Sequence, residues 1–273
     1  MIKHMKEIEA LSNEVQNRYE TQTSQVGTEI LGGHFHLGYW DNTTNDNKSA
    51  TRKLTELMID KVRIQPGQRF CDFGCGVGGP AIQLAETKGC YVDGITISEF
   101  QYNDACRRGL ASSVPDSVRF YHGNALSTPW ENETYDGGWF FESIFHMGHA
   151  NALAETHRVL KPNAELIIAD LPLLPHADDL FVKWSLEKGL AVHVHPDQYE
   201  ALFSDAGFEL VSYHDVSDNV MSPLVEKTKE LIATKTELLS MHSSPAAIDD
   251  ALYVYDQMAG NLGYALITAK KKY

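Results

Sequence analysis

The chain has 273 residues, of which 43% are hydrophobic and 22% charged, the balance of a globular protein that forms one large domain. Its formal net charge of −14 argues against a nucleic-acid partner, because such binding depends on Lys and Arg that neutralise phosphates. No apolar run reaches the ~18 residues of a membrane span, and the opening MIKHMKEIEA lacks the apolar core of a secretory signal. The cysteines show neither CxxC pairing nor a metal-ligand pattern with histidine. We therefore expect a cytoplasmic protein with reduced thiols, no metal site and no membrane partner.

The first fifty residues precede any strand that could belong to a central sheet. Apolar residues recur there at helical spacing, at Ile8, Leu11, Val15 and Tyr19. A glycine- and aromatic-rich segment follows, LGGHFHLGYW at 31–40, for which a hairpin packed on the flank of the domain is one alternative. An amphipathic helix is then predicted from Leu54, Leu57, Met58 and Val62. Pro66 and Gly67 form the turn that ends it.

The stretch RFCDFGCGVGGP at 69–80 predicts a strand, a glycine turn and the start of a helix. Phe70, Cys71 and Phe73 have the pattern of a short buried strand, with Asp72 near its end. The turn contains Gly74, Gly76, Gly78 and Gly79. Glycine permits positive φ and lets a ligand lie against bare backbone, and the helix N-terminus offers unpaired N–H groups. Such a turn at the carboxyl end of a parallel strand is where α/β folds bind their cofactors.

The spacing of the glycines narrows the choice of cofactor. A phosphate-binding P-loop requires GxxxxGK[ST], and no Lys-Ser or Lys-Thr follows this turn. A GxGxxG pattern fits Gly74, Gly76 and Gly79, which leaves a dinucleotide open at this point. The next predicted strand, at 91–96, ends in Thr96, where a nucleotide-binding domain usually places a carboxylate for the ribose hydroxyls. This substitution counts against NAD.

Three further predicted strands bring polar residues to the same edge. The strand at 118–122 runs into Gly123, Asn124 and Ala125. The strand that begins at Tyr135 runs into ESIFHM, which places Glu142 at its end and His146 at a helix start. A helix is predicted to end at the proline of RVLKPN, and the following strand, AELIIAD, ends in Asp170.

Taken together, these patterns resemble the class I methyltransferases that use S-adenosyl-L-methionine (SAM). DFGCGVG is similar to their D-x-G-x-G-x-G signature. GITISEFQ resembles the G-I-[ST]-[IL]-S-x-x-Q variant of cyclopropane-synthase-like and several natural-product methyltransferases. E-S-x-x-H-M, R-V-L-K-P and A-D extend the resemblance along the chain. The whole chain, including GYW and GYALITAKK, most resembles natural-product small-molecule O-methyltransferases of the rebeccamycin sugar O-methyltransferase type.

The resemblance implies an α/β fold with a Rossmann-like seven-stranded sheet, an N-terminal helical lid and a helical acceptor cap. Within one domain, residues 1–50 would form the lid segment and residues 51–173 the SAM-binding core. Residues 174–273 would carry the cap insertions and the last two strands, the last of them antiparallel beside the fifth. In this part we predict helices over 180–190, 195–203 and 224–241 and strands over 209–215 and 264–270.

The resemblance also implies that SAM is bound, with S-adenosyl-L-homocysteine as product. The implied cofactor-binding residues are Tyr19, Asp72, Gly74, Gly76, Gly78, Thr96, Gln101, Asn124, Ala125 and Glu142. In the family the acidic residue before the glycines helps to bind the methionine end, and the hydroxyl and amide of the variant motif bind the ribose. Asn124 stands where the family commonly has Asp, and it can still accept from the adenine amino group through its carbonyl oxygen. The backbone of Ala125 would face the edge of the adenine ring.

Methyl transfer to a hydroxyl needs exclusion of water, alignment of the acceptor and removal of a proton. His146, four residues past Glu142, is the candidate base, and Asp170 is its orienting partner or an alternative base. The similar enzymes tend to carry two adjacent histidines, and the first of these is Phe145 here. The alternatives are structural: His146 could bond to backbone at the helix start, and Asp170 could cap a helix.

The acceptor itself remains open between several classes of small molecule. A hydroxyl of a sugar, polyketide or other secondary metabolite is the first hypothesis. C-methylation of an isoprenoid diphosphate or activated aromatic ring is the second, and a diphosphate would need the cationic cluster of Lys183, Lys188, His193 and His195. N-methylation of an amine and a non-catalytic SAM-binding partner are further alternatives. Nucleic-acid methylation is disfavoured by the absence of an N/D-P-P-Y/F motif. Whether the lid is contributed across a homo-oligomer also stays open.

Overall fold

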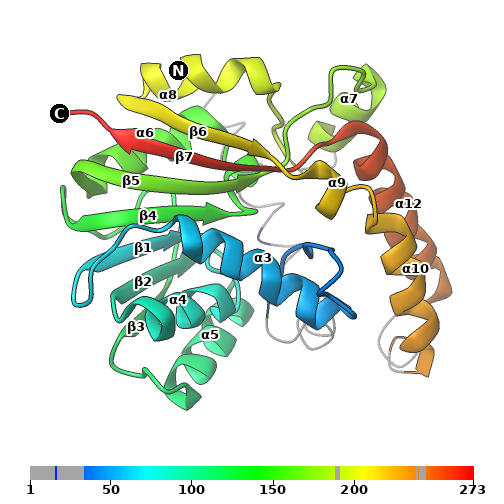
Figure 1. Cartoon of the computed structure of the whole chain (residues 1–273), viewed down its shortest axis with the longest axis horizontal. Coiled ribbons are helices and arrows are strands. Elements are labelled where there is room, and N and C mark those ends of the chain that lie inside the picture. The colour runs from blue at the N-terminus through cyan, green and yellow to red at the C-terminus, as the bar shows by residue number, and fades with distance from the viewer. Residues whose placement is uncertain (1–15, 17–33, 188–190, 238, 240–243) are drawn as a thin grey trace.

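A computed structural model describes residue 16 and residues 34–187, 191–237, 239 and 244–273. Tyr19 and the helix predicted around it lie outside these residues. A seven-stranded sheet with the order β3-β2-β1-β4-β5-β7-β6 forms the centre of the molecule (Figure 1). Its strands are β1 (Arg69–Phe73), β2 (Tyr91–Thr96), β3 (Val118–His122), β4 (Tyr135–Phe141), β5 (Leu160–Asp170), β6 (Phe208–Asp215) and β7 (Ala265–Lys271).

The direction of the strands confirms the predicted architecture. β1 to β5 are joined by parallel pairs, and β7 runs antiparallel to both of its neighbours, β5 and β6. The register places Asp72 beside Gly94 and Trp139, and Phe141 beside Ala169. The residues that follow β1, β2, β4 and β5 therefore meet at one edge of the sheet, where a parallel α/β sheet binds its ligands.

Helices cover both faces of the sheet, and each face has its own apolar core. Figure 1 shows α3 (Asn47–Lys61), α4 (Gly79–Lys88) and α5 (Glu99–Ala111) in front of the sheet. Behind it lie α6 (His149–Val159) and α8 (Tyr199–Asp205), which follow the short 3-10 turns η1 (Ile144–His146) and η2 (Pro196–Gln198). Alternate strand residues enter opposite cores: Phe70 packs in the α3–α4 core, and Cys71 and Phe73 in the other.

Beyond the carboxyl ends of the parallel strands stand the helices of the cap (Figure 1): α7 (Asp179–Glu187), α9 (Ser217–Val220), α10 (Leu224–Thr234) and α12 (Pro245–Asn261). α12 departs from the sequence prediction, which placed no helix there. Although α12 has a serine cap and a proline at its first turn, it buries only Asn261. A helix with so little buried surface has a weak apolar periodicity, and periodicity was the signal used.

The junction of α6 and β5 also differs from the prediction. The helix was expected to continue to Pro162, but α6 ends at Val159 and β5 begins at Leu160, which pairs with Tyr135 of β4. Proline lacks an N–H and cannot continue a helix, and Asn163 adopts a φ of +65°. The bulge between the β4 and β5 registers accommodates this irregular start of β5.

The segment at 34–46 connects the sheet edge with the cap, and its action as a lid stays a prediction. Trp40 N–H donates to the Asn219 carbonyl at 2.8 Å, and the Asn219 side-chain amide donates back to the Trp40 carbonyl at 2.8 Å. Lys227 Nζ lies 5.2 Å from the centre of the Trp40 ring, a cation–π contact. We call residues 34–40 the lid segment and these contacts the lid–cap seam.

Lys271 at the end of β7 provides a test of how the last strand is anchored. Its Nζ is buried and donates to the carbonyls of His157 at 2.8 Å and Leu160 at 2.7 Å. We expect Lys271→Met to lower the free energy of unfolding by about 1–3 kcal/mol, because two buried carbonyls lose their donor. The exposed neighbour Lys272 is the control, and Lys272→Met should stay within about 0.5 kcal/mol of the wild type in denaturant unfolding. Equal effects of the two variants would contradict the anchor.

Candidate active site at the carboxyl edge of the sheet

Three glycines of the turn after β1 have positive φ, but their surroundings differ. A Cβ added at Gly74 (φ +85°) would lie 2.6 Å from Ser143 Cβ, and one added at Gly78 (φ +80°) would lie 2.6 Å from the Phe120 ring. A Cβ added at Gly76 (φ +53°) would meet nothing within 4 Å. Gly74 and Gly78 therefore allow close packing, whereas the backbone of Gly76 faces open space that a ligand can occupy.

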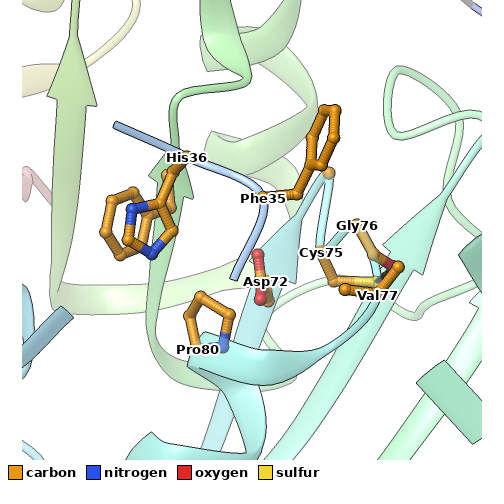
Figure 2. Close-up of a pocket in the computed structure, with 9 residues that line it drawn as sticks. Phe35, His36, Asp72, Cys75, Gly76, Val77 and Pro80 are labelled. Carbon is orange, nitrogen blue, oxygen red and sulfur yellow. Dashed lines mark hydrogen bonds between the residues drawn. The ribbon is translucent and has the colours of Figure 1, made fainter. Parts of the chain in front are cut away.

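This open space belongs to a small pocket that opens to solvent. Its lining comes from the glycine turn, the end of β4 and the lid segment, as Phe35, His36, Asp72, Gly74, Cys75, Gly76, Val77, Pro80 and Phe141. Figure 2 shows the coil segment that carries Phe35 and His36 crossing over Asp72, opposite Cys75 and Gly76. Residues far apart in the sequence thus enclose Asp72, whose contact with the methionine end of the cofactor stays a prediction.

Asp72 is the buried charge of this pocket. Its side chain is 1% exposed, and Oδ1 has no hydrogen-bond partner in the part of the chain that the structure describes. Burial raises the pKa of Asp72 to about 7, because the ionised form has lost its water. Trp139 favours the ionised form, but not enough to offset burial. A buried carboxylate with an unpartnered oxygen is costly to the protein alone. A cationic ligand group would remove that cost.

Thr96 and Gln101, the two residues of the variant ribose motif, are brought together. Both are buried, and the Thr96 hydroxyl donates to Gln101 Oε1 at 2.8 Å. This bond orients the Gln101 amide and leaves its NH₂ group as donor. Ser98 accepts from the Gln101 N–H and caps α5, which holds the motif at the carboxyl end of β2.

Asn124 and Ala125 follow β3 at the far end of the predicted cofactor site. Asn124 is exposed, and its Oδ1 accepts from the Leu126 N–H at 2.9 Å. One lone pair of that oxygen is therefore used within the loop and one remains for a ligand. Ala125 is buried in the α6-side core. The adenine contact of this pair stays a prediction.

Glu142 directly follows β4 and joins three parts of the molecule. It has a φ of +51°, and its Oε1 accepts from the Leu37 N–H at 2.9 Å and from the Tyr264 hydroxyl at 2.6 Å. Burial raises the pKa of Glu142 to about 7, although both hydrogen bonds favour the ionised form. Glu142, a predicted cofactor-binding residue, thus also links the lid segment to Tyr264, the residue before β7.

His36 lines the pocket, although the sequence pattern did not assign it a role. Its ring stacks on Phe141 at a centroid distance of 4.1 Å, and its two nitrogens bond to the Leu37 carbonyl at 2.7 Å and the Thr55 hydroxyl at 3.0 Å. Burial lowers the pKa of His36 to about 3, so the ring is neutral. The lid therefore presents an uncharged aromatic wall, for which the HFH repeat in the glycine-rich segment was the available signal.

At the end of β5, Asp170 is buried and fully engaged by donors. Its Oδ2 lies 2.6 Å from His149 Nε2 and 2.6 Å from the Tyr199 hydroxyl, and its Oδ1 accepts from the Leu171 N–H at 2.8 Å. Burial alone disfavours the carboxylate, but the facing His149 and these hydrogen bonds hold the pKa of Asp170 below its usual range.

The imidazole that Asp170 contacts is thus His149 and not the expected His146. His146 ends the η1 turn and packs edge-on against Phe145, with ring centroids 4.5 Å apart. Gly148, at a φ of +76°, then turns the chain so that His149 begins α6 under the end of β5. Sequence analysis did not single out His149, because its partner lies on another strand. A histidine just after a glycine at this edge was the signal.

Other classes of site are not supported by the described ranges. They contain no group of three His, Cys, Asp or Glu side chains that could hold a metal ion. All four cysteines lie within the described residues and are free thiols. Within those ranges, every helix is too short or too polar to cross a membrane.

Comparison with known sequences points to one enzyme class. A family model described as "Methyltransferase domain" matches residues 70–163. The 27-O-demethylrifamycin SV methyltransferase of Amycolatopsis mediterranei is 31% identical over 267 residues, which cover 95% of this chain and 97% of that protein. The (+)-O-methylkolavelool synthase of Herpetosiphon aurantiacus is 31% identical over 258 residues, covering 89% of this chain and 88% of that protein.

Solved structures share the fold of this chain. The cyclase SpnF matches with a TM-score of 0.80 at 25% identity, covering 96% of this chain and 97% of its own. The geranyl diphosphate C-methyltransferase of Streptomyces coelicolor A3(2) matches with a TM-score of 0.74 at 20% identity, covering 96% and 98%, a likeness of fold alone. With a glycine turn open at Gly76, a buried Asp72 whose Oδ1 has no partner among the described residues, and relatives aligned over most of their length, the chain belongs to the class I SAM-dependent methyltransferases of small molecules.

Proposed function

We propose that this chain transfers the methyl group of SAM to a hydroxyl oxygen of an uncharged secondary metabolite. The observation that carries the proposal is the buried histidine–carboxylate pair at the end of β5, at the same edge of the sheet as the glycine turn. A hydroxyl must lose its proton during methylation, and a positioned base serves that purpose. The names of two near-full-length relatives, a demethylrifamycin methyltransferase and an O-methylkolavelool synthase, support the same chemistry.

The pocket residues fit SAM through two features. Asp72 is a buried carboxylate whose Oδ1 has no partner among the described residues, which suits the cationic methionine end, and Gly76 leaves space where a Cβ would intrude. Thr96 and Gln101 would hold the ribose, and Phe35 and His36 would cover the pocket against water. Bound SAM supplies a methyl group that its sulfonium already activates.

A diphosphate acceptor is less well supported by the same edge of the sheet. Lys183 is exposed and lies 3.8 Å from Glu187, and His195 is exposed in the loop before α8. His193 Nδ1 bonds to the Leu171 carbonyl at 3.0 Å, and burial lowers the pKa of His193, which keeps it neutral. Lys188 lies outside the described residues. Those that are described form no cationic cluster here, which favours an uncharged hydroxyl over C-methylation of an isoprenoid diphosphate.

Gly76 offers a direct test of the cofactor position. We expect Gly76→Ala to weaken SAM binding about tenfold or more, because its methyl group enters the pocket and displaces a contact worth about 1–3 kcal/mol. Gly78→Ala is the matched control: it has a similar positive φ, but its methyl meets Phe120. It should lower the melting temperature more and SAM affinity less. Calorimetric titration and thermal unfolding measure both, and normal SAM affinity in Gly76→Ala would contradict the position.

The raised pKa of Asp72 predicts that SAM binding depends on pH. The free protein favours the neutral carboxyl up to about pH 7, whereas a cationic ligand favours the carboxylate. Binding should therefore release a proton, and affinity should fall as the pH drops below about 7. Titration calorimetry in two buffers of different ionisation enthalpy measures the release. Asp72→Asn should remove most of it, and an unchanged release would assign it to another group such as Glu142.

The function itself is tested by an assay for transfer to defined acceptors. Protein and SAM are incubated with a panel of alcohols and phenols, including 27-O-demethylrifamycin SV, and separately with geranyl diphosphate and with simple amines. Mass spectrometry detects methylated product and S-adenosylhomocysteine. We expect methylation of a hydroxyl compound. Methylation of geranyl diphosphate or of an amine alone would replace the proposal, and SAM binding without any transfer across an extended panel would favour a non-catalytic role.

A further inference from the structure

A second feature of the sheet edge concerns which side chain receives the proton. His149, Asp170 and Tyr199 come from α6, β5 and α8 and form one buried cluster. The side chains of His149 and Asp170 are 4% and 1% exposed. The rings of His149 and Tyr199 also meet edge-on, with centroids 6.0 Å apart. The His149 ring is therefore fixed by two neighbours.

The hydrogen bonds determine the tautomer of His149. An ionised carboxylate is an acceptor only, so the nitrogen that contacts Asp170, Nε2, carries the hydrogen. In the neutral ring the other nitrogen, Nδ1, then holds a lone pair. Nδ1 is buried and has no hydrogen-bond partner among the residues that the structure describes. Buried polar atoms nearly always have a partner, so this nitrogen is suited to a group that arrives with a ligand.

The position of His149 suits contact with an acceptor. It lies two residues after Met147, whose Cε would be 3.2 Å from a Cβ at Gly74 in the glycine turn. The chain near the cap contacts the η1 turn that precedes His149, since the Val192 N–H donates to the Phe145 carbonyl at 2.7 Å. β4 and β5 pair Phe141 with Ala169, so that Glu142 and Asp170 follow at neighbouring positions. His149 thus follows a turn that contacts both the glycine turn, through Met147, and the cap, through Phe145.

We propose that His149 Nδ1, rather than His146, accepts the proton of the acceptor hydroxyl, with Asp170 and Tyr199 as positioning residues. This inference rests on the proposed transfer to a hydroxyl. As the new oxygen–carbon bond forms, the carbon–sulfur bond of the cofactor breaks and its electron pair stays on sulfur. The hydroxyl proton moves to Nδ1, and the Asp170 carboxylate stabilises the resulting imidazolium, as the aspartate of a catalytic triad does. Solvent later removes the proton.

The tautomer can be measured without any acceptor. The full chain is labelled with ¹⁵N-histidine and studied by NMR with S-adenosylhomocysteine present, and the His149 signals are assigned by their loss in His149→Gln. We expect a neutral ring protonated at Nε2, with a hydrogen-bonded Nε2 proton that changes in Asp170→Asn. A ring protonated at Nδ1, or at both nitrogens at neutral pH, would overturn the proposal. If His149→Gln does not fold, His149→Asn provides the assignment.

Turnover then separates the two histidines, with the hydroxyl acceptor that the transfer assay identifies. His149→Gln should lower kcat by about a hundredfold with unchanged affinity for S-adenosylhomocysteine, and His146→Gln should affect kcat much less. Imidazole added to His149→Ala should restore part of the turnover, which a purely structural role would not allow. A His149→Gln enzyme with normal kcat, or a larger loss in His146→Gln, overturns the proposal. Absence of SAM binding or hydroxyl methylation in the wild type would instead refute the proposed function, and the tautomer would still be measured.

Discussion

The compensation of buried carboxylates at one edge of the sheet organises the site. Asp170 has three donors, and its pKa lies below the usual range. Glu142 has two donors and a raised pKa, and Asp72 has an oxygen without a partner in the described chain and a raised pKa as well. Burying a charge without a partner is costly. The protein's own donors satisfy the carboxylate of Asp170. Asp72, which precedes the glycine turn, would gain its missing partner from a cationic ligand group.

Much of the fold could be predicted from the sequence because its signals are local. The buried strand, the glycine turn and α4 are specified within 69–88. Thr96 and Gln101 meet because they are close in sequence, on either side of the turn between β2 and α5. The partner of Asp170 could not be predicted, since Gly148, α6 and β5 together determine which histidine faces it. The role of the pocket-lining residues of the lid segment depends in the same way on contacts distant in sequence. The role of Tyr19 stays a prediction.

The two faces of the sheet support different groups of site residues. The α3–α4 face holds the cofactor pocket, where Phe141 packs under the neutral ring of His36. The α6–α8 face supplies the histidine–carboxylate–tyrosine cluster at the end of β5. Strand alternation produces this division, because Asp170 follows Ile168 on the α6–α8 side while Phe141 and Ala169 belong to the other core. The cofactor pocket and the His149–Asp170 pair therefore meet at one edge of the sheet, although they are supported by different cores.

The lid–cap seam has a consequence for the order of events in a catalytic cycle. Trp40 exchanges two hydrogen bonds with Asn219, and Leu37 in the same segment bonds to Glu142. Any movement that uncovers the glycine turn must break these bonds or carry the cap along. Release of S-adenosylhomocysteine from the glycine turn would then be coupled to movement of the cap, and such a movement can limit turnover instead of the chemical step.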